Sequence, residues 1–285
     1  MEEMMKIKKA FTHGGKFHSD DVFSAALLRI LFPEIEIIRG FVIPEDFDGL
    51  VFDIGLGAFD HHQEEKEVRE NGCPYAAFGL LWREFGTRLL NEEEALLFDE
   101  SFIQPLDYSD NTGEPCDLAR RISIFNPSWD EEGDADEFFF RAVDIAQAIL
   151  ERQLVYAKGR EKANLMLEEA MEHMENHILI LPRFIPWKKY LVDSDVYFAI
   201  FPSERGGYNA QPAIEDAEEE IFKVPFPQEW WGKPKEELQK ISGIETLTFC
   251  HATGFLLAAD TLEDAVKACE EAMKIECSLG ISFIP

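Results

Sequence analysis

The 285-residue chain is 46% hydrophobic and 12% aromatic, which is enough apolar surface for packed cores and excludes a largely disordered protein. Acids outnumber bases by 56 to 27, and the resulting net charge of −29 excludes a basic platform for long duplex nucleic acid. No apolar run reaches the roughly 18 residues that cross a bilayer, and the first ten residues lack a signal-peptide core, so we expect a cytoplasmic protein without membrane contact.

The first 62 residues predict the start of an α/β domain. Basic and apolar residues alternate over 6–11, which indicates a short strand that runs into a Thr-His-Gly-Gly loop. A helix is expected next, and Pro33 ends it. Residues 34–39 and 50–54 are typical of two further strands of a buried sheet, so the order of elements is βαββ.

Helical periodicity dominates the middle of the chain, and the last third is rich in strands. Helices are expected over 74–90 and 91–106, with a long helical stretch between 133 and 177. Strands are then expected at 178–181, 190–192, 196–201, 209–214, 247–250 and 255–259, with a hairpin turn at 203–207 and a last helix from Thr261.

These elements predict an α/β fold in two domains. Residues 1–135 would form a domain with a mainly parallel sheet flanked by helices, and residues 136–175 a helical connector. Residues 176–285 would form a smaller α+β domain that binds substrate.

The loop between the first strand and the first helix holds His13, His18, Asp20 and Asp21 within nine positions. Ligands of an α/β protein gather at the carboxyl ends of its strands, where this loop lies. A mixed set of imidazole and carboxylate ligands suits manganese, iron, zinc or magnesium better than a soft metal. The alternative is that each is an ordinary loop residue, with the two acids only complementing the helix dipole.

A second cluster begins with Asp53 at a strand end and continues with Asp60-His61-His62. The two oxygens of such an aspartate can bridge two cations, and one of two adjacent histidines can ligate a metal while its neighbour faces the substrate. A capping aspartate and two solvent-facing histidines are the alternative.

Asp107 and Asp110 form a third piece of the predicted site, near the end of the helix expected over 91–106. One of their carboxylates can complete the shell of a second metal ion, while the other is structural. The spacing alone does not decide between them.

At these residues the chain resembles the DHH phosphoesterase superfamily, and within it the branch named for the melanocyte proliferating gene. The resemblance implies a two-domain α/β fold with a dinuclear metal centre that cleaves phosphoester or phosphoanhydride bonds, and eukaryotic members are linked to RNA exonuclease activity. The stretches that carry it are THGGKFHSDD (12–21), FDHHQ (59–63), PYAAFGLLW (74–82), SGI (242–244) and HATGF (251–255).

Carried over position by position, the resemblance gives each candidate a role. The first motif falls on His13, His18 and Asp20, the bridging aspartate on Asp53, and the signature on Asp60-His61-His62; the fourth motif falls on Asp110 or else on Asp107. His62 would donate a hydrogen bond to the scissile phosphate or protonate the leaving group, with Asp60 beside it.

The sequence departs from the superfamily pattern in two places. Its first motif has His18-x-Asp20 or the adjacent pair Asp20-Asp21 in place of D-x-D, which leaves open which side chain serves which ion. The step of seven positions from Asp53 to Asp60 is also short, which leaves little room for the element usually found between these two motifs.

In the second domain, Arg205, His251 and Gly254 are candidate substrate-binding residues, since a Gly-rich, histidine-containing segment of DHH relatives resembles a phosphate clamp. A hairpin turn at Arg205 and a core histidine at 251 explain the same residues equally well.

The sequence therefore predicts a metal-dependent hydrolase of phosphodiester bonds in a short oligonucleotide or nucleotide, with two divalent cations, manganese before magnesium, activating a water. A phosphoanhydride hydrolase and a non-catalytic, metal-stabilised interaction protein are the alternatives. The expected partner is a phosphate-containing small molecule or short oligonucleotide, not long duplex nucleic acid or a membrane. A homodimer is compatible with the sequence, which leaves the oligomeric state open.

Overall fold

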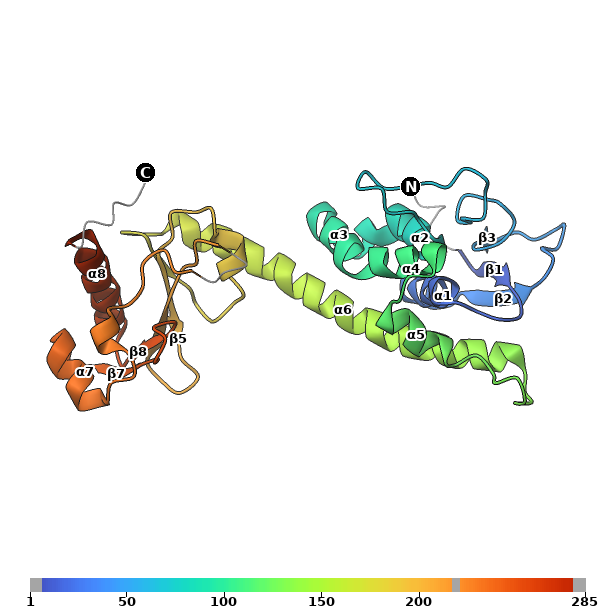
Figure 1. Cartoon of the computed structure of the whole chain (residues 1–285). Helices are drawn as coiled ribbons and strands as arrows, with labels where there is room; N and C mark the ends of the chain where they lie inside the picture. Colours follow the sequence, from blue (N-terminus) through green and yellow to red (C-terminus); the bar gives the residue numbers. More distant parts are fainter. Residues whose placement is uncertain (1–6, 217–220, 279–285) are drawn as a thin grey trace. The chain divides into compact units, whose positions relative to one another are not determined.

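The computed structural model describes residues 7–216 and 221–278, and it divides into two compact units, residues 1–159 and 160–285. Figure 1 shows the order of the elements along the chain. Those of the first unit are β1 (Lys9–His13), α1 (Ser19–Leu31), β2 (Glu36–Gly40), β3 (Leu50–Val51), α2 (Ala77–Phe85), η2 (Gly86–Arg88), α3 (Glu92–Phe98), the π-helical turn η3 (Asp99–Ile103), α4 (Gln104–Thr112) and α5 (Asp117–Ser123). Helix α6 (Ala135–Glu172) contributes to both units.

The first unit contains a three-stranded parallel sheet in the order β2-β1-β3. Helix α1 packs against α2, α4 and α5, so that its residues 19–28 are all buried. This burial explains the nearly continuous apolar run of α1, which has no solvent-facing stripe over those turns. The hydrophobic core therefore surrounds the helix whose first turn carries Asp20 and Asp21.

The second unit contains a five-stranded mixed sheet in the order β4-β5-β6-β8-β7. The pair β4 and β5 is parallel and the other pairs are antiparallel. Its elements are β4 (Ile178–Ile180), η4 (Lys188–Leu191), β5 (Phe198–Pro202), β6 (Tyr208–Pro212), η5 (Gln228–Trp230), α7 (Lys235–Ser242), β7 (Leu247–Cys250), β8 (Leu257–Ala259) and α8 (Leu262–Ser278).

The predicted α/β class, with a parallel sheet in the N-terminal part and a mixed sheet in the C-terminal part, is confirmed. The expected hairpin turn at 203–207 is also present: Ser203 N–H donates to the Gly207 carbonyl (2.9 Å), and Gly206 and Gly207 both have positive φ. The expected division at residues 135 and 175 remains a prediction.

Several expected elements begin or end at other residues, such as the strand expected at 50–54, which is Leu50–Val51, and two differ in kind or extent. The strand expected at 190–192 is wrong, because this segment forms the 3-10 turn η4, in which Tyr190 N–H bonds the Trp187 carbonyl at 3.1 Å. A three-residue apolar run is too short to distinguish a strand from a turn. The helix expected over 91–106 is divided by the π-helical turn η3, and the helical segment continues to Thr112.

Among the helices of residues 7–216 and 221–278, none combines the length and the apolar character that crossing a bilayer requires.

Candidate metal centre

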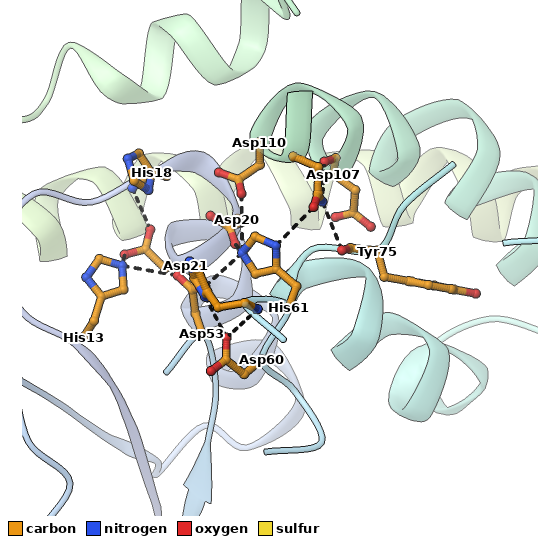
Figure 2. A network of polar contacts seen from close by, with 12 residues as sticks. His13, His18, Asp20, Asp21, Asp53, Asp60, His61, Tyr75, Asp107 and Asp110 are labelled. Atoms are coloured by element: carbon orange, nitrogen blue, oxygen red, sulfur yellow. Dashed lines mark hydrogen bonds and ion pairs between the residues drawn. The ribbon is translucent and has the colours of Figure 1, made fainter. Parts of the chain in front are cut away.

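Four segments of the first unit bring imidazoles and carboxylates together at one edge of the parallel sheet (Figure 2). His13 is the last residue of β1, and Asp53 follows β3 by two residues. The strands β1 and β3 are parallel neighbours, so their carboxyl ends meet at the same edge. Asp20 and Asp21 lie in the first turn of α1, and Asp110 lies on α4.

The His13 ring lies between two carboxylates. Its Nε2 atom is 3.2 Å from Asp21 Oδ2 and 3.2 Å from Asp53 Oδ2, and its Nδ1 atom is 3.0 Å from the Gly14 carbonyl oxygen. Contacts with Asp21 and Asp53 raise the pKa of His13 to about 10, although burial opposes this shift. A ring that donates Nδ1–H to a carbonyl and presents Nε2 to carboxylates has the orientation of a metal-ligating histidine.

His61 faces a second set of carboxylates. Its Nε2 atom lies 3.2 Å from Asp53 Oδ1, 3.4 Å from Asp110 Oδ2 and 3.5 Å from Asp20 Oδ2. Burial would lower the pKa of His61, but Asp53 and Asp110 outweigh it and raise the pKa above its ordinary value. The protonated, positively charged form of His61 is therefore favoured among these carboxylates.

Asp53 is shared by both sets, since Oδ2 faces His13 and Oδ1 faces His61. Its φ of +53° lies in the left-handed region, which is uncommon for a residue other than glycine, and its N–H bonds the Phe59 carbonyl at 2.9 Å. Burial raises the pKa of Asp53, but the contacts with both histidines lower it below the usual value overall. This backbone turn aims one carboxylate at two imidazoles.

Several buried carboxylate oxygens lack a hydrogen bond within the described part of the chain. Both oxygens of Asp20 are in this state, and so are Oδ2 of Asp21 and Oδ1 of Asp53. Burial and the neighbouring carboxylates raise the pKa of Asp20 well above its ordinary value, and burial also raises that of Asp21. Three of these oxygens, Asp20 Oδ2, Asp21 Oδ2 and Asp53 Oδ1, lie 3.2–3.5 Å from a histidine Nε2 atom, so the histidines offset part of the cost of burying the carboxylates. A divalent cation would offset the remainder.

Three groups of side chains have ligand atoms within 4.8 Å of one another and can hold a metal ion. Oxygen and imidazole nitrogen ligands fit a divalent cation such as Mn²⁺, Mg²⁺, Fe²⁺ or Zn²⁺. The groups are Asp53 with His61 and His62, His13 with Asp21 and Asp53, and His18 with Asp20 and Asp110.

Of the two predicted catalytic residues, His62 belongs to the first of these groups and Asp60 lies beside it. The carboxylate of Asp60 is buried, and its Oδ2 accepts a hydrogen bond from Leu56 N–H (2.6 Å), which holds the loop between Asp53 and the histidines. Its Oδ1 is 2.7 Å from Nδ1 of His62, whose side chain is 59% exposed. His62 is therefore fixed at one ring nitrogen and accessible to solvent.

Of the two aspartates in the third piece, Asp110 reaches His61 and Asp107 does not belong to any of the three groups. The Asp107 carboxylate is fully buried, 2.8 Å from the Arg69 guanidinium, and accepts from Gly79 N–H at 3.2 Å. Burial raises the pKa of Asp107 to about 7, against the effect of Arg69. This geometry agrees with a structural aspartate that ties α4 to α2.

Arg205, His251 and Gly254 lie in the second unit, and their role in substrate binding remains a prediction. Arg205 is exposed in the hairpin turn, while His251 Nδ1 is 3.0 Å from the Thr253 hydroxyl. Gly254 has a φ of +70°, and a Cβ at this position would collide with Trp231. The positive φ and the close approach of Trp231 therefore explain the glycine at this position.

The structure adds two residues to the site. Asp21, which the sequence left open beside Asp20, contacts His13 directly. Asn111 Oδ1 lies 3.4 Å from His61 Nδ1, and its Nδ2 donates to the carbonyls of Tyr75 and Asp107 at 3.0 Å each. The one available signal was the position of Asn111 next to Asp110, which does not reveal this orientation.

The fold and this centre define an α/β protein with a candidate metal site built from aspartates and histidines. A family model for MYG1 exonuclease, described as Uncharacterised protein family (UPF0160), matches residues 9–273, and the chain belongs to this family.

Relatives align along almost the whole chain. The human MYG1 exonuclease is 28% identical, with 93% of this chain and 85% of the relative covered. The MYG1 protein of Dictyostelium discoideum is 28% identical (90% and 93% covered), and that of Chlamydia pneumoniae is 30% identical (93% and 94%). No solved structure matches significantly.

Proposed function

We propose that this chain is a metal-dependent phosphoesterase that hydrolyses a phosphodiester bond in a short oligonucleotide or nucleotide, in the manner of an exonuclease. The observation that carries the proposal is the carboxylate of Asp53 held between His13 and His61, with the unsatisfied oxygens of Asp20 beside it. The human, rat, mouse and bovine relatives bear the name MYG1 exonuclease, which supports nuclease chemistry.

Two cations fit this arrangement. His13, Asp21 and Asp53 would hold one, and Asp53 with His61 would hold the other, completed by Asp20 or Asp110. The mixed ligand set favours Mn²⁺, with Mg²⁺ second. When bound, a cation pair activates water for attack on phosphorus and stabilises charge on the phosphate oxygens. The pattern of these residues supports membership of the DHH phosphoesterase superfamily.

His62 is the residue of this chain placed to handle a proton. Asp60 Oδ1 accepts from Nδ1–H of His62, which leaves Nε2 on the exposed edge of the ring. From there the imidazole can donate a hydrogen bond to a phosphate oxygen or protonate the leaving oxygen. Asp60 orients the ring, because its other oxygen is fixed by Leu56 N–H.

Charge favours a short substrate. A chain of net charge −29 repels a long polyanion, whose affinity depends on many phosphate contacts, whereas one or two phosphates need only a local site. We therefore expect a short oligonucleotide or nucleotide to be cleaved faster than long duplex.

The test is a substrate panel: the purified protein is incubated with Mn²⁺, Mg²⁺ or EDTA and with pyrophosphate, cyclic dinucleotides, 5′-labelled short RNA and long duplex. The proposal predicts cleavage of the short RNA that requires the metal. Cleavage of pyrophosphate alone would favour a phosphoanhydride hydrolase, and absence of any metal-dependent turnover would contradict the enzyme proposal.

The matched variants are His61→Ala, in the centre, and His173→Ala, at an exposed histidine of the second unit. His61→Ala should abolish turnover with little change in folding, measured by circular dichroism. His173→Ala should keep the activity of the unmodified chain. An active His61→Ala enzyme would defeat the assignment of the site.

A further inference from the structure

A pocket of about 570 Å³ opens beside the candidate metal centre, within the first unit. Its lining includes His18, His61, His62 and Asp110, and α5 contributes Arg120 and Ser123. The volume falls in the range of small-molecule sites, roughly 300–1,000 Å³, and is larger than a single phosphate requires. The pocket therefore has room for the part of a substrate that flanks the reacting group.

The charge of this pocket is opposite to that of the chain. Its lining includes the two bases Lys66 and Arg120 and one acid, Asp110. In three other pockets of the first unit the acids outnumber the bases: 3 to 2 around Phe47, 4 to 1 around Phe140, and 2 to 1 around Trp82. Two bases beside a carboxylate-rich centre contrast with the excess of acids, 56 to 27, in the whole chain.

Neither base is neutralised by a carboxylate within the described residues. Lys66 Nζ donates to Asn111 Oδ1 at 2.9 Å, and this acceptor is an uncharged amide. The Arg120 side chain has no hydrogen bond or ion pair with any residue that the structure describes. Both residues are exposed, so their N–H groups are available to an anion without the loss of an existing ion pair.

We propose that Lys66 and Arg120 bind a second phosphate of the substrate, on the 5′ or the 3′ side of the bond that is cleaved. This inference rests on the proposed function and specifies its substrate class as nucleotides with at least two phosphates. The guanidinium of Arg120 can donate two N–H groups to phosphate oxygens as a fork, and Lys66 adds a point charge. The pair offsets the field of the acidic chain beside the reacting group, which favours recognition of the phosphate next to the reacting one.

The experiment measures binding without turnover. The Mn²⁺-loaded protein is titrated by calorimetry with an ApA analogue whose bridging ester oxygen is replaced by a methylene group, either unmodified or carrying a phosphate at its 5′ or its 3′ end. We expect one of the two terminal phosphates to increase affinity about tenfold, the effect of one charge-assisted contact.

Arg120→Gln should reduce this advantage about fivefold. The matched control is Arg121→Gln, which removes the same charge from the neighbouring exposed position of α5, outside the pocket, and should keep the advantage. Equal affinities for all three analogues, no measurable binding of any, or an advantage that survives in Arg120→Gln would each overturn the inference.

Turnover of hydrolysable ApA is measured separately on the same preparations. A protein that prefers the phosphorylated analogue through Arg120 but cleaves nothing would contradict the proposed function and support the pocket. A protein that cleaves ApA but whose affinity for the analogues does not depend on Arg120 would support the proposed function and contradict the inference about the pocket.

Discussion

The two units bury different kinds of side chain. All the buried polar and charged residues among 7–216 and 221–275, the positions whose burial the structure describes, lie in the first unit, most of them at or near the candidate metal centre. The buried residues of the second unit are hydrophobic, with Phe198, Phe226 and Trp230 among the largest. Buried carboxylates oppose folding unless they are paired, whereas buried rings stabilise the fold. The buried carboxylates of the candidate metal centre therefore lower the stability of the first unit, whereas the buried side chains of the second unit carry no such cost.

The largest effect is expected at the shared carboxylate of the first unit. Asp53→Asn should lower kcat/KM for a short RNA on the order of a thousandfold, the loss typical of removing one preorganised charge-stabilising group. Asp117→Asn, at an exposed aspartate of α5, is the control and should retain activity. Steady-state kinetics with saturating Mn²⁺ measure both, and equal rates would remove Asp53 from the site.

Next in size is a core substitution in the second unit. Phe226 is fully buried, with its ring centroid 5.0 Å from that of Phe198, so Phe226→Ala should lower the free energy of unfolding by about 3–5 kcal/mol. Urea unfolding followed by tryptophan fluorescence measures this loss. Because Phe226 belongs to the core cluster of the second unit, the affinity for Mn²⁺ should stay unchanged under native conditions. A parallel loss of Mn²⁺ affinity would show that the two regions are not distinct in the way described.

A smaller effect is expected at Asn111, the positioning residue of the first unit. Asn111→Leu removes the amide that orients His61, and loss of such an outer contact typically lowers metal affinity about 10–100-fold. Asn71→Leu removes an amide from an exposed hydrogen bond with Gln104 and serves as the control. Calorimetric titration with Mn²⁺ distinguishes them, since a purely structural role for Asn111 would leave the affinity at the wild-type value.

The smallest expected effect is a gain in the stability of the metal-free fold, whereas the preceding effects are losses. Asp20→Asn removes a carboxyl group whose ionisation burial and the neighbouring carboxylates oppose, so it should stabilise the metal-free fold by about 1–2 kcal/mol at neutral pH while it weakens Mn²⁺ binding. Thermal unfolding in EDTA measures the gain. A destabilised variant would mean that the contact of the Asp20 carboxylate with His61 outweighs its repulsion by the neighbouring carboxylates in the metal-free protein.

The same residue predicts a pH dependence for the metal-free chain. The folded state holds the pKa of Asp20 well above its ordinary 3.8, so the folded chain binds this proton more tightly than the unfolded one. The resulting stabilisation is fully present below pH 3.8 and is lost as the pH rises through the raised pKa. Unfolding in EDTA at increasing pH should reveal this loss in the wild type and a flatter profile in Asp20→Asn.

The sequence was most informative where local order and chemistry coincide. The segment around His13 could be placed at a strand end because a strand, glycines and a helix follow one another directly, and the DHH triplet drew attention to His61. The sequence did not distinguish Asp20 from Asp21, because adjacent residues on a helix point about 100° apart and only the packing of α1 decides which one faces His13.

The sequence did not predict which residues far apart along the chain lie near one another in the fold. Lys66 and Arg120 line one pocket although 54 positions separate them, and no periodic pattern links a loop to α5. The segment 190–192 was expected to be a strand, and it lies at the end of the turn η4 instead, because a run of three apolar residues carries no period. Tertiary packing, which the sequence does not display, determined all of these positions.

Diffraction from crystals soaked in Mn²⁺, with data collected at the manganese absorption edge, tests the central claim most directly. The account predicts two anomalous peaks in the first unit, both within coordination distance of Asp53, with His13 beside one and His61 beside the other. Peaks only at surface carboxylates, or none at Asp53, would contradict it.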